Sequence, residues 1–280
     1  MADVAVVVFE QDGSSFYRLA EPARVLREQG APITVVRPGD PIPEADIIVV
    51  NRPVLAPWAD FVEDMVAEGR RVVVDIDDSY EHLASNHMAR VVVDPNDAAR
   101  ACKAATAVVV TTPALVTVYP AEELHVVPNY VPQRYLDVVP KAGHEGLWVG
   151  WAGSVTAHPN DLLVANDRIG RAVNEEGATV AFVGSRDQTR LVAAQLGYKG
   201  PVVCTNFMEI GVYPEAVSNF DVGIVPLDDT FFNECKSWLK GLEMAAVGVP
   251  FVASPTAEYQ ALFSRYGIGR PAKHPSDWYW

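Results

Sequence analysis

The stretch "DVGIVPLDDTFFNECKSWLKGLEMAAVGVPFVAS", residues 221–254, decides the fold because it holds a complete strand–helix–strand unit. An apolar strand ends at Leu227, and a polar loop leads to a helix that we expect to begin near Asn233, a residue type that often caps helix N-termini. The helix stops at Gly248, and a second apolar strand follows at once. Since strands joined through a helix lie parallel in a sheet, this stretch predicts an α/β protein.

The same alternation of strand and helix patterns continues along the whole chain. Short apolar, β-branched runs lie at 4–9, 33–36, 46–50, 71–76, 107–112, 124–128, 147–153, 178–184, 201–204, 221–227 and 249–254. Helical patterns in the first half lie at 15–29, 57–69, 97–105 and 113–119. Continuous apolar strands of this kind are typical of a parallel sheet that is covered on both faces.

A linker rich in Pro and Gly interrupts this pattern at residues 128–146. We therefore predict two Rossmann-like, doubly wound domains, an N-terminal one at 1–143 and a C-terminal one at 144–280. Open α/β sheets bind their ligands at the carboxyl ends of the strands. Two such domains would face each other across a cleft, and functional residues should lie on the loops that follow the strands.

Charge and cysteine content exclude several classes of protein. The formal net charge is −14, and acidic residues outnumber basic ones in both halves, which disfavours a general grip on nucleic acid or on an anionic membrane surface. The three cysteines have no C-x-x-C spacing and indicate neither a disulfide framework nor a zinc site. We expect a cytoplasmic protein, with no signal peptide at the N-terminus and no apolar run of the roughly 20 residues that a membrane span needs.

The helix in residues 233–247 carries charged groups at helical spacing. Lys236, Lys240 and Glu243 fall on one face of it. The side that we expect to be buried carries Leu239, Leu242 and Ala246. One interpretation is a solvated face with a single ion pair. The other is a phosphate site, because a lysine in the first helical turn opposes the helix dipole and an anion would offset it.

Five motifs follow one another along the chain: "GSSFYRLAEPARVL" (13–26), "VVVDIDD" (72–78), "GWAGS" (150–154) with the following His and Asp-Leu, "DVGIVPL" (221–227) and the spacing N-x2-K-S-x-L-K-x-L-E (233–243). In this order they resemble retaining GT-B glycosyltransferases, a family that includes sucrose and glycogen synthases. The pattern is most similar to that of short bacterial and phage-type members. The resemblance implies a two-domain GT-B architecture and the transfer of a sugar from a nucleotide sugar with retention of configuration.

The resemblance also implies roles for residues that would bind the donor. Glu243 would accept hydrogen bonds from the ribose hydroxyls, and Lys236 would contact the diphosphate. The turn with Gly153 and Ser154 would bring backbone N–H groups close to the phosphates, although an ordinary strand-to-helix turn would have the same sequence.

Three further donor-side residues follow from the resemblance. Arg186 corresponds to a basic residue near the diphosphate, and Phe207 or Met208 would form an apolar wall beside the nucleobase, unless both belong to the core. One departure is clear. The common donor motif of the family has two glutamates, and the first of these positions holds Cys235 here, with Glu234 one place earlier.

Three carboxylates end the fourth strand, at Asp75, Asp77 and Asp78. They cannot all be buried and ionised without a cation or hydrogen-bond donors. A metal site, an acceptor-binding or base site, and a solvated turn are the alternatives. Because protein cations do the work of a metal in GT-B enzymes, we expect no metal, and we favour Asp77 or Asp78 as the residue that contacts the acceptor. Together with Lys236 they are the candidate catalytic residues.

Other candidates on the acceptor side lie near the ends of the first and seventh strand patterns. The loop after the first strand holds Gly13, Ser14 and Ser15. Arg18 could reach the donor phosphates or the acceptor, or it could be a surface residue paired with Glu21. His158 could orient a phosphate or could be a simple helix-entry residue.

The predicted reaction moves a glycosyl group from a nucleotide diphosphate sugar, with a UDP-sugar favoured, to an acceptor hydroxyl, and no cofactor is expected. The acceptor stays open: a glycan, a lipid-linked glycan, a protein and a modified nucleic acid base all fit. One alternative is a haloacid-dehalogenase-type, magnesium-dependent phosphatase that uses Asp75 and Asp77, with Lys199 and the pair Asp228 and Asp229. Another is a protein that binds a nucleotide sugar without turnover.

Overall fold

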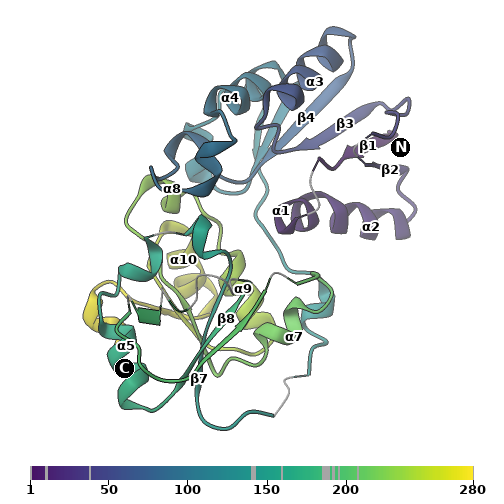
Figure 1. Cartoon of the computed structure of the whole chain (residues 1–280). Helices are drawn as coiled ribbons and strands as arrows, with labels where there is room; N and C mark the ends of the chain where they lie inside the picture. Colours follow the sequence, from purple (N-terminus) through teal and green to yellow (C-terminus); the bar gives the residue numbers. More distant parts are fainter. Residues whose placement is uncertain are drawn as a thin grey trace. The chain divides into compact units, whose positions relative to one another are not determined.

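The computed structural model describes residues 2–9, 12–37, 39–139, 143–158, 160–184, 190, 193–194, 196–206 and 208–279. The chain divides into two compact units. The first unit comprises residues 1–85, 89–130 and 235–237, and the second comprises 86–88, 131–234 and 238–280. Each unit is built on one parallel sheet (Figure 1). The three residues 235–237 therefore belong to the first unit although they lie late in the sequence.

The sheet of the first unit has six parallel strands in the order β2-β1-β3-β4-β5-β6. The strands are β1 (Val4–Val7), β2 (Ile33–Val36), β3 (Ile47–Asn51), β4 (Arg71–Ile76), β5 (Ala107–Val110) and β6 (Leu124–Val126). The direction in which strands are added reverses at β1, between its neighbours β2 and β3. In a doubly wound sheet, the loops at this reversal open a crevice at the carboxyl ends of the strands.

The sheet of the second unit also has six strands, in the order β12-β11-β10-β7-β8-β9. The strands are β7 (Trp148–Ala152), β8 (Thr179–Val183), β9 (Val202–Thr205), β10 (Val222–Val225), β11 (Phe251–Ala253) and β12 (Arg270–Pro271). All pairings are parallel, and the order reverses between β7 and β10. This is the strand order of dinucleotide-binding sheets, whose ligands lie at the reversal. The expected α/β class with two Rossmann-like, doubly wound sheets is confirmed.

Helices cover the sheets. They are α1 (Gly13–Ser15), α2 (Glu21–Glu28), α3 (Ala56–Ala67), α4 (Pro95–Ala104), α5 (Arg168–Glu175), α7 (Tyr213–Val217), α8 (Phe231–Glu234), α9 (Leu239–Ala246) and α10 (Ala257–Ala261). π-Helical turns extend two of them, at Phe16–Ala20 and Leu262–Tyr266. Short 3₁₀ turns lie at Tyr80–His82, Met88–Val91, Pro113–Thr117, Gln133–Tyr135, Val155–Ala157, Asp161–Leu163 and Pro275–Trp278. Figure 1 shows α3 and α4 side by side over the first sheet. No helix within the described ranges is long and apolar enough to cross a membrane.

Burial of large side chains holds the second sheet together. Trp151 and Phe182, on neighbouring strands, and Ile169 of α5 are at most 1% exposed and belong to one apolar cluster. Removing such surface from water contributes about 25 cal/mol per Å². Trp151 lies one residue before the end of its strand, and an atom of its ring would lie 3.4 Å from a Cβ at Gly153, in the loop that follows β7.

The predicted start of the helix near Asn233 is wrong. The structure has a short helix α8 that ends at Glu234, and α9 begins only at Leu239. Asn233 lies inside α8 and is no N-cap, and its amide donates to Asp161 Oδ1 (2.7 Å) and to the carbonyl of Asp228 (3.0 Å). Residues 235–238 lie between the two helices, and there the carbonyl of Cys235 accepts from Thr112 Oγ1 at 2.9 Å. Lys236 therefore lies in the segment before α9 and not in its first turn.

The predicted faces of α9 are also wrong. Leu239, Leu242 and Ala246 are only half-buried. Gly241, Glu243 and Met244 are the buried residues of the helix. Gly241 lies on this side because a Cβ there would come within 2.7 Å of the Phe251 ring. The interpretation of Glu243 as part of a solvated face is thus excluded, since the residue is only 5% exposed.

Candidate functional site

In the first unit, the predicted carboxylates at the end of β4 have separate partners. Asp75 is held by Arg18: Nη2 lies 2.6 Å from Oδ2, and both side chains are 5% exposed. Arg18 also donates to the carbonyl of Val127 (2.7 Å) and to Asn129 Oδ1 (3.1 Å). Arg18 is therefore no surface partner of Glu21, and its buried charge is offset by Asp75.

Asp77 faces the loop after β1. The hydroxyl of Ser14 donates to Asp77 Oδ2, while Oδ1 is buried and has no hydrogen-bond partner among the described residues. Burial raises the pKa of Asp77 to about 6, the charges of Asp78 and Asp75 act in the same direction, and Arg52 and the Ser14 hydrogen bond oppose them. A buried acceptor atom without a donor can be satisfied by a ligand hydroxyl. The geometry thus provides a group that can bind or deprotonate a hydroxyl near neutral pH.

The neighbours of Asp77 in the loop after β1 differ in what they do. Gly13, Ser14 and Ser15 form a first helical turn, α1, whose N-cap is Asp12. Ser15 is 2% exposed and donates to Asn51 Oδ1 at 3.2 Å, which commits it to the core. Of the three residues, Ser14 is therefore the one whose side chain reaches the carboxylates.

Lys236 forms an ion pair with Asp78 within the first unit. Their charged atoms Nζ and Oδ1 are 2.9 Å apart, and the side chains are 17% and 30% exposed. Asn129 Nδ2 fixes the same segment by donating to Ser237 Oγ at 2.8 Å. Two of the candidate catalytic residues, Lys236 and Asp78, thus meet. Within the described ranges, no three His, Cys, Asp or Glu side chains gather in a way that could hold a metal ion.

In the second unit, Gly153 lies at the reversal of the sheet, directly after β7. Its φ of 141° is open to glycine, and a Cβ at this position would lie 2.8 Å from Lys240 Nζ. Gly184 follows β8 with a φ of 95°, and a Cβ there would lie 3.1 Å from the carbonyl oxygen of Gly153. The two glycines let Lys240 and the loops after β7 and β8 lie close together. Ser154 is half-buried at the start of the turn that follows.

Lys240 is supported by a chain of buried polar groups. Its Nζ lies 4.9 Å from the centre of the Trp151 ring and 3.0 Å from His158 Nε2. His158 Nδ1 lies 2.6 Å from Asp161 Oδ2. Although burial works to raise it, the hydrogen bond and electrostatic interaction with His158, the N–H of Asp228 and the charge of Lys240 together hold the pKa of Asp161 below its usual value. Sequence reasoning placed Lys240 only on the same face as Lys236 and gave it no role.

Glu243 lies one turn along α9 from Lys240. The Tyr213 hydroxyl donates to Glu243 Oε2 at 3.2 Å. Burial, followed by the charge of Glu243, raises the pKa of Tyr213 well above its ordinary value, so that Tyr213 is a neutral donor. A carboxylate can accept about four hydrogen bonds, which suits it to a ligand with two adjacent hydroxyls.

The structure adds little about the other predicted donor-side residues. Met208 is half-buried after β9. Arg186 and Phe207 lie outside the described residues. The sequence gave no sign of a site role for Arg52, which follows β3 with a φ of 50°, or for Asp161, whose Oδ2 lies 2.6 Å from His158 Nδ1.

The phosphatase alternative finds no support in this arrangement. Asp75 and Asp77 belong to the first unit, whereas Lys199 and Asp228 belong to the second. A nucleophile, a lysine and an acidic pair that act on one phosphate would have to gather at one sheet edge. Instead, Asp75 is occupied by Arg18.

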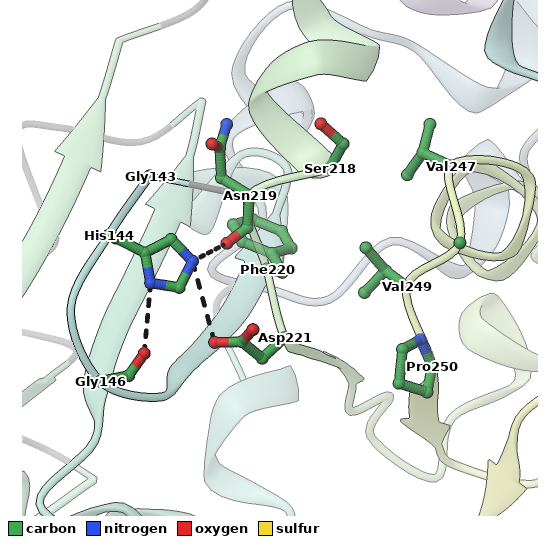
Figure 2. A pocket seen from close by; sticks show the side chains of 11 residues that line it. Gly143, His144, Gly146, Ser218, Asn219, Phe220, Asp221, Val247, Val249 and Pro250 are labelled. Carbon is green, nitrogen blue, oxygen red and sulfur yellow. Dashed lines mark hydrogen bonds and ion pairs between the residues drawn. The ribbon is translucent and has the colours of Figure 1, made fainter. Parts of the chain in front are cut away.

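A pocket of about 460 Å³ lies elsewhere in the second unit, at the amino ends of β7, β10 and β11 (Figure 2). Its His144 ring stacks on Trp148 with 4.2 Å between ring centres, and His144 Nε2 lies 2.9 Å from the carbonyl of Asn219. None of the residues predicted from the sequence lines this pocket. The predicted donor residues Gly153 and Glu243 thus lie away from it, and Gly153 is at the carboxyl end of β7.

Comparison with known proteins shows the fold. No family model matches the chain, and no curated protein matches it in sequence. Solved structures do match. Sucrose-phosphate synthase from Thermosynechococcus elongatus has a TM-score of 0.66 and 13% identity, with 99% of this chain and 88% of that chain covered.

Two further structures are similar over nearly the whole chain. An alpha-glucosyltransferase in complex with UDP and a 13-mer DNA containing an HMU base has a TM-score of 0.65 and 13% identity, covering 98% of this chain and 84% of its own. Anabaena HepE in complex with UDP and glucose has a TM-score of 0.59 and 14% identity, covering 98% and 87%. The chain therefore has the two-sheet α/β fold of GT-B glycosyltransferases.

Proposed function

We propose that this protein is a glycosyltransferase that moves a sugar from a nucleoside diphosphate sugar, with a UDP-sugar favoured, to an acceptor hydroxyl. The observation that carries the proposal is the meeting of Gly153 and Lys240 at the strand-order reversal of the second sheet, with the buried Glu243 one turn further along α9. A cation beside a glycine turn suits a diphosphate, and a buried carboxylate suits vicinal hydroxyls. The presence of UDP in two structures of the same fold supports this choice of donor.

In this proposal the second domain, residues 144–280, binds the donor. Lys240 and the backbone N–H groups of Gly153 and Ser154 contact the diphosphate, and Glu243 accepts from the ribose hydroxyls. Arg186 adds positive charge near the diphosphate. Phe207 or Met208 packs against the nucleobase.

The first domain, residues 1–143, binds the acceptor. Ser14 and Asp77 contact the hydroxyl that is glycosylated, since Asp77 Oδ1 is a buried acceptor atom that lacks a donor within the described part of the chain. Asp78 keeps Lys236 in place, and Lys236 is the proposed second cation for the leaving diphosphate.

The chemistry is largely electrostatic. The bond between the anomeric carbon and the diphosphate oxygen breaks, and its electron pair stays on the diphosphate. A new bond forms to the acceptor oxygen, whose proton passes to Asp77. Fixed cations and N–H groups stabilise the charge that develops on the leaving group. We propose retention of anomeric configuration and no obligatory metal, in a cytoplasmic setting. Chelation with EDTA should therefore leave the rate unchanged.

The test is a screen of UDP-sugars with candidate glycans, lipid-linked glycans, peptides and modified bases, in which released UDP and the mass of the acceptor are measured. The proposal predicts UDP release that depends on one class of acceptor and an increase of the acceptor mass by one sugar. A protein that binds UDP-sugars tightly but releases no UDP under any condition would favour the non-catalytic alternative. NMR of the product distinguishes retention from inversion.

A further inference from the structure

The buried groups around Lys240 fix the position of its protons. An ammonium only donates hydrogen bonds, and so Nε2 of His158, 3.0 Å from Lys240 Nζ, must accept. An ionised carboxylate only accepts, and so Nδ1 of His158, 2.6 Å from Asp161 Oδ2, must donate. The contacts on the two sides therefore require the same neutral tautomer of His158, with its proton on Nδ1.

Asp161 is oriented for this task by its other oxygen. Oδ1 accepts from the backbone N–H of Asp228 at 2.9 Å and from the Asn233 amide at 2.7 Å. The carboxylate is 5% exposed and His158 is 9% exposed, so that neither group can turn freely into water. The rings of Trp151 and His158 pack edge to face, with 5.9 Å between ring centres, and the Nζ of Lys240 lies over the Trp151 ring.

We propose that Asp161 and His158 are positioning residues that hold the Lys240 ammonium beside Gly153 for a diphosphate. Asp161 sets the tautomer of His158, and that tautomer offers a lone pair to Lys240. This inference rests on the proposed function. It adds that diphosphate binding requires each hydrogen bond in the series Asp161–His158–Lys240 to run in a fixed direction from donor to acceptor, whatever the size of the side chains. Among the charged groups of the described residues, Asp161 faces His158 on one side and Lys240 faces it on the other.

The variant Asp161→Asn tests polarity alone. Its Oδ1 can keep the hydrogen bonds from Asp228 and Asn233, which places the new NH₂ group toward His158 Nδ1. Nδ1 must then accept, the proton moves to Nε2, and that N–H points at the Lys240 ammonium. Two donors now face each other, and Lys240 is displaced. We expect binding of UDP and of inorganic pyrophosphate to weaken about tenfold or more, and binding of uridine to stay unchanged.

His158 provides the matched pair of variants. In His158→Gln, a planar amide can donate toward Asp161 and accept from Lys240, so we expect pyrophosphate affinity within about threefold of wild type. In His158→Leu, the volume is similar but the polarity is lost, and the affinity should fall as in Asp161→Asn. Asp221→Asn is the control, because it removes a half-exposed carboxylate at the opposite end of the same sheet.

The experiment is calorimetric titration of each full-length variant with UDP, uridine and inorganic pyrophosphate, together with ¹⁵N NMR of the His158 ring. A proton on Nδ1 in wild type and on Nε2 in Asp161→Asn, with the predicted order of affinities, supports the inference. A proton on Nε2 in wild type, or equal affinity for pyrophosphate in His158→Leu and His158→Gln, overturns the inference. If Asp161→Asn does not fold, the two His158 variants decide. Wild-type protein that binds neither UDP nor pyrophosphate would instead contradict the proposed function.

Discussion

Gly153 and Lys240 leave no room for a side chain between them: a Cβ at position 153 would lie 2.8 Å from Lys240 Nζ. The loop after β7 and the first turn of α9 are thus matched in shape at one point of the second unit. A larger residue at 153 would have to displace the lysine.

We therefore expect Gly153→Ala to weaken UDP binding strongly and to destabilise the fold by about 1–3 kcal/mol, because the φ of 141° is strained for alanine. Titration with UDP and thermal unfolding measure the two effects. Gly177→Ala is the control, since Gly177 also has a positive φ of 62° but no atom within 4 Å of the added Cβ. This control should lose stability yet keep its UDP affinity. If both variants bound UDP with equal affinity, Gly153 would not be part of the UDP site.

Replacement of Glu243 should remove ribose recognition. In Glu243→Gln the side chain keeps its size but loses acceptor capacity and charge, and a lost hydrogen bond to a charged group costs roughly 1.5–3 kcal/mol. The expected result is a UDP affinity at least about tenfold lower, with little change for inorganic pyrophosphate. Glu176→Gln, at an exposed position, serves as the control. An unchanged UDP affinity in Glu243→Gln would refute the assigned role.

The pKa of Asp77, raised to about 6, predicts a pH dependence. In the unfolded chain this carboxyl ionises near pH 4, so between pH 4 and pH 6 the folded state binds the proton more tightly. Folding stability contributed by this group is therefore present below about pH 4 and falls as the pH rises to about 6, by on the order of 2–3 kcal/mol at most.

Asp77→Asn should lack this fall, and denaturant unfolding of both proteins from pH 4 to pH 7 measures it. Asp137→Asn, at an exposed position, should follow the wild-type curve. Parallel curves for wild type and Asp77→Asn would show that Asp77 has an ordinary pKa.

The Arg18–Asp75 ion pair should stabilise the fold. Both side chains are 5% exposed, and removing one partner leaves an uncompensated buried charge, which costs about 3–5 kcal/mol. We expect Arg18→Ala to lose that much stability in chemical denaturation. Arg24→Ala, at a position with a 53% exposed side chain, should lose less than about 1 kcal/mol although it breaks two ion pairs. Similar losses in the two variants would contradict the assignment of Arg18 to the core.

The strands could be predicted from the sequence because their signal is local. Continuous β-branched runs such as 33–36 and 71–76 coincide with β2 and β4 to the residue. The break before α9 could not be predicted, because the helical periodicity continues from Lys236 to Glu243. What breaks the helix is contact with Thr112 and Asn129, residues more than 100 positions earlier.

In the candidate site, too, local sequence patterns predicted some features, and contacts between distant residues could not be predicted. Residue types after strands identified Gly153 and Asp77 as positions of interest, and the helical spacing with the family resemblance identified Glu243. Their partners depend on the folded topology: Arg18 meets Asp75 across 57 residues, and Lys240 meets His158 across 82. No local pattern encodes such pairs, and a lysine on a helix face therefore gave no sign that Lys240 rather than Lys236 lies beside Gly153.

The most direct measurement is a crystal structure of the protein with UDP bound. Our account predicts that the diphosphate lies within hydrogen-bond distance of Lys240 Nζ and the backbone N–H of Gly153, and that the ribose hydroxyls contact Glu243. UDP bound only in the pocket beside His144 and Asp221, or a ribose without contact to Glu243, would contradict it.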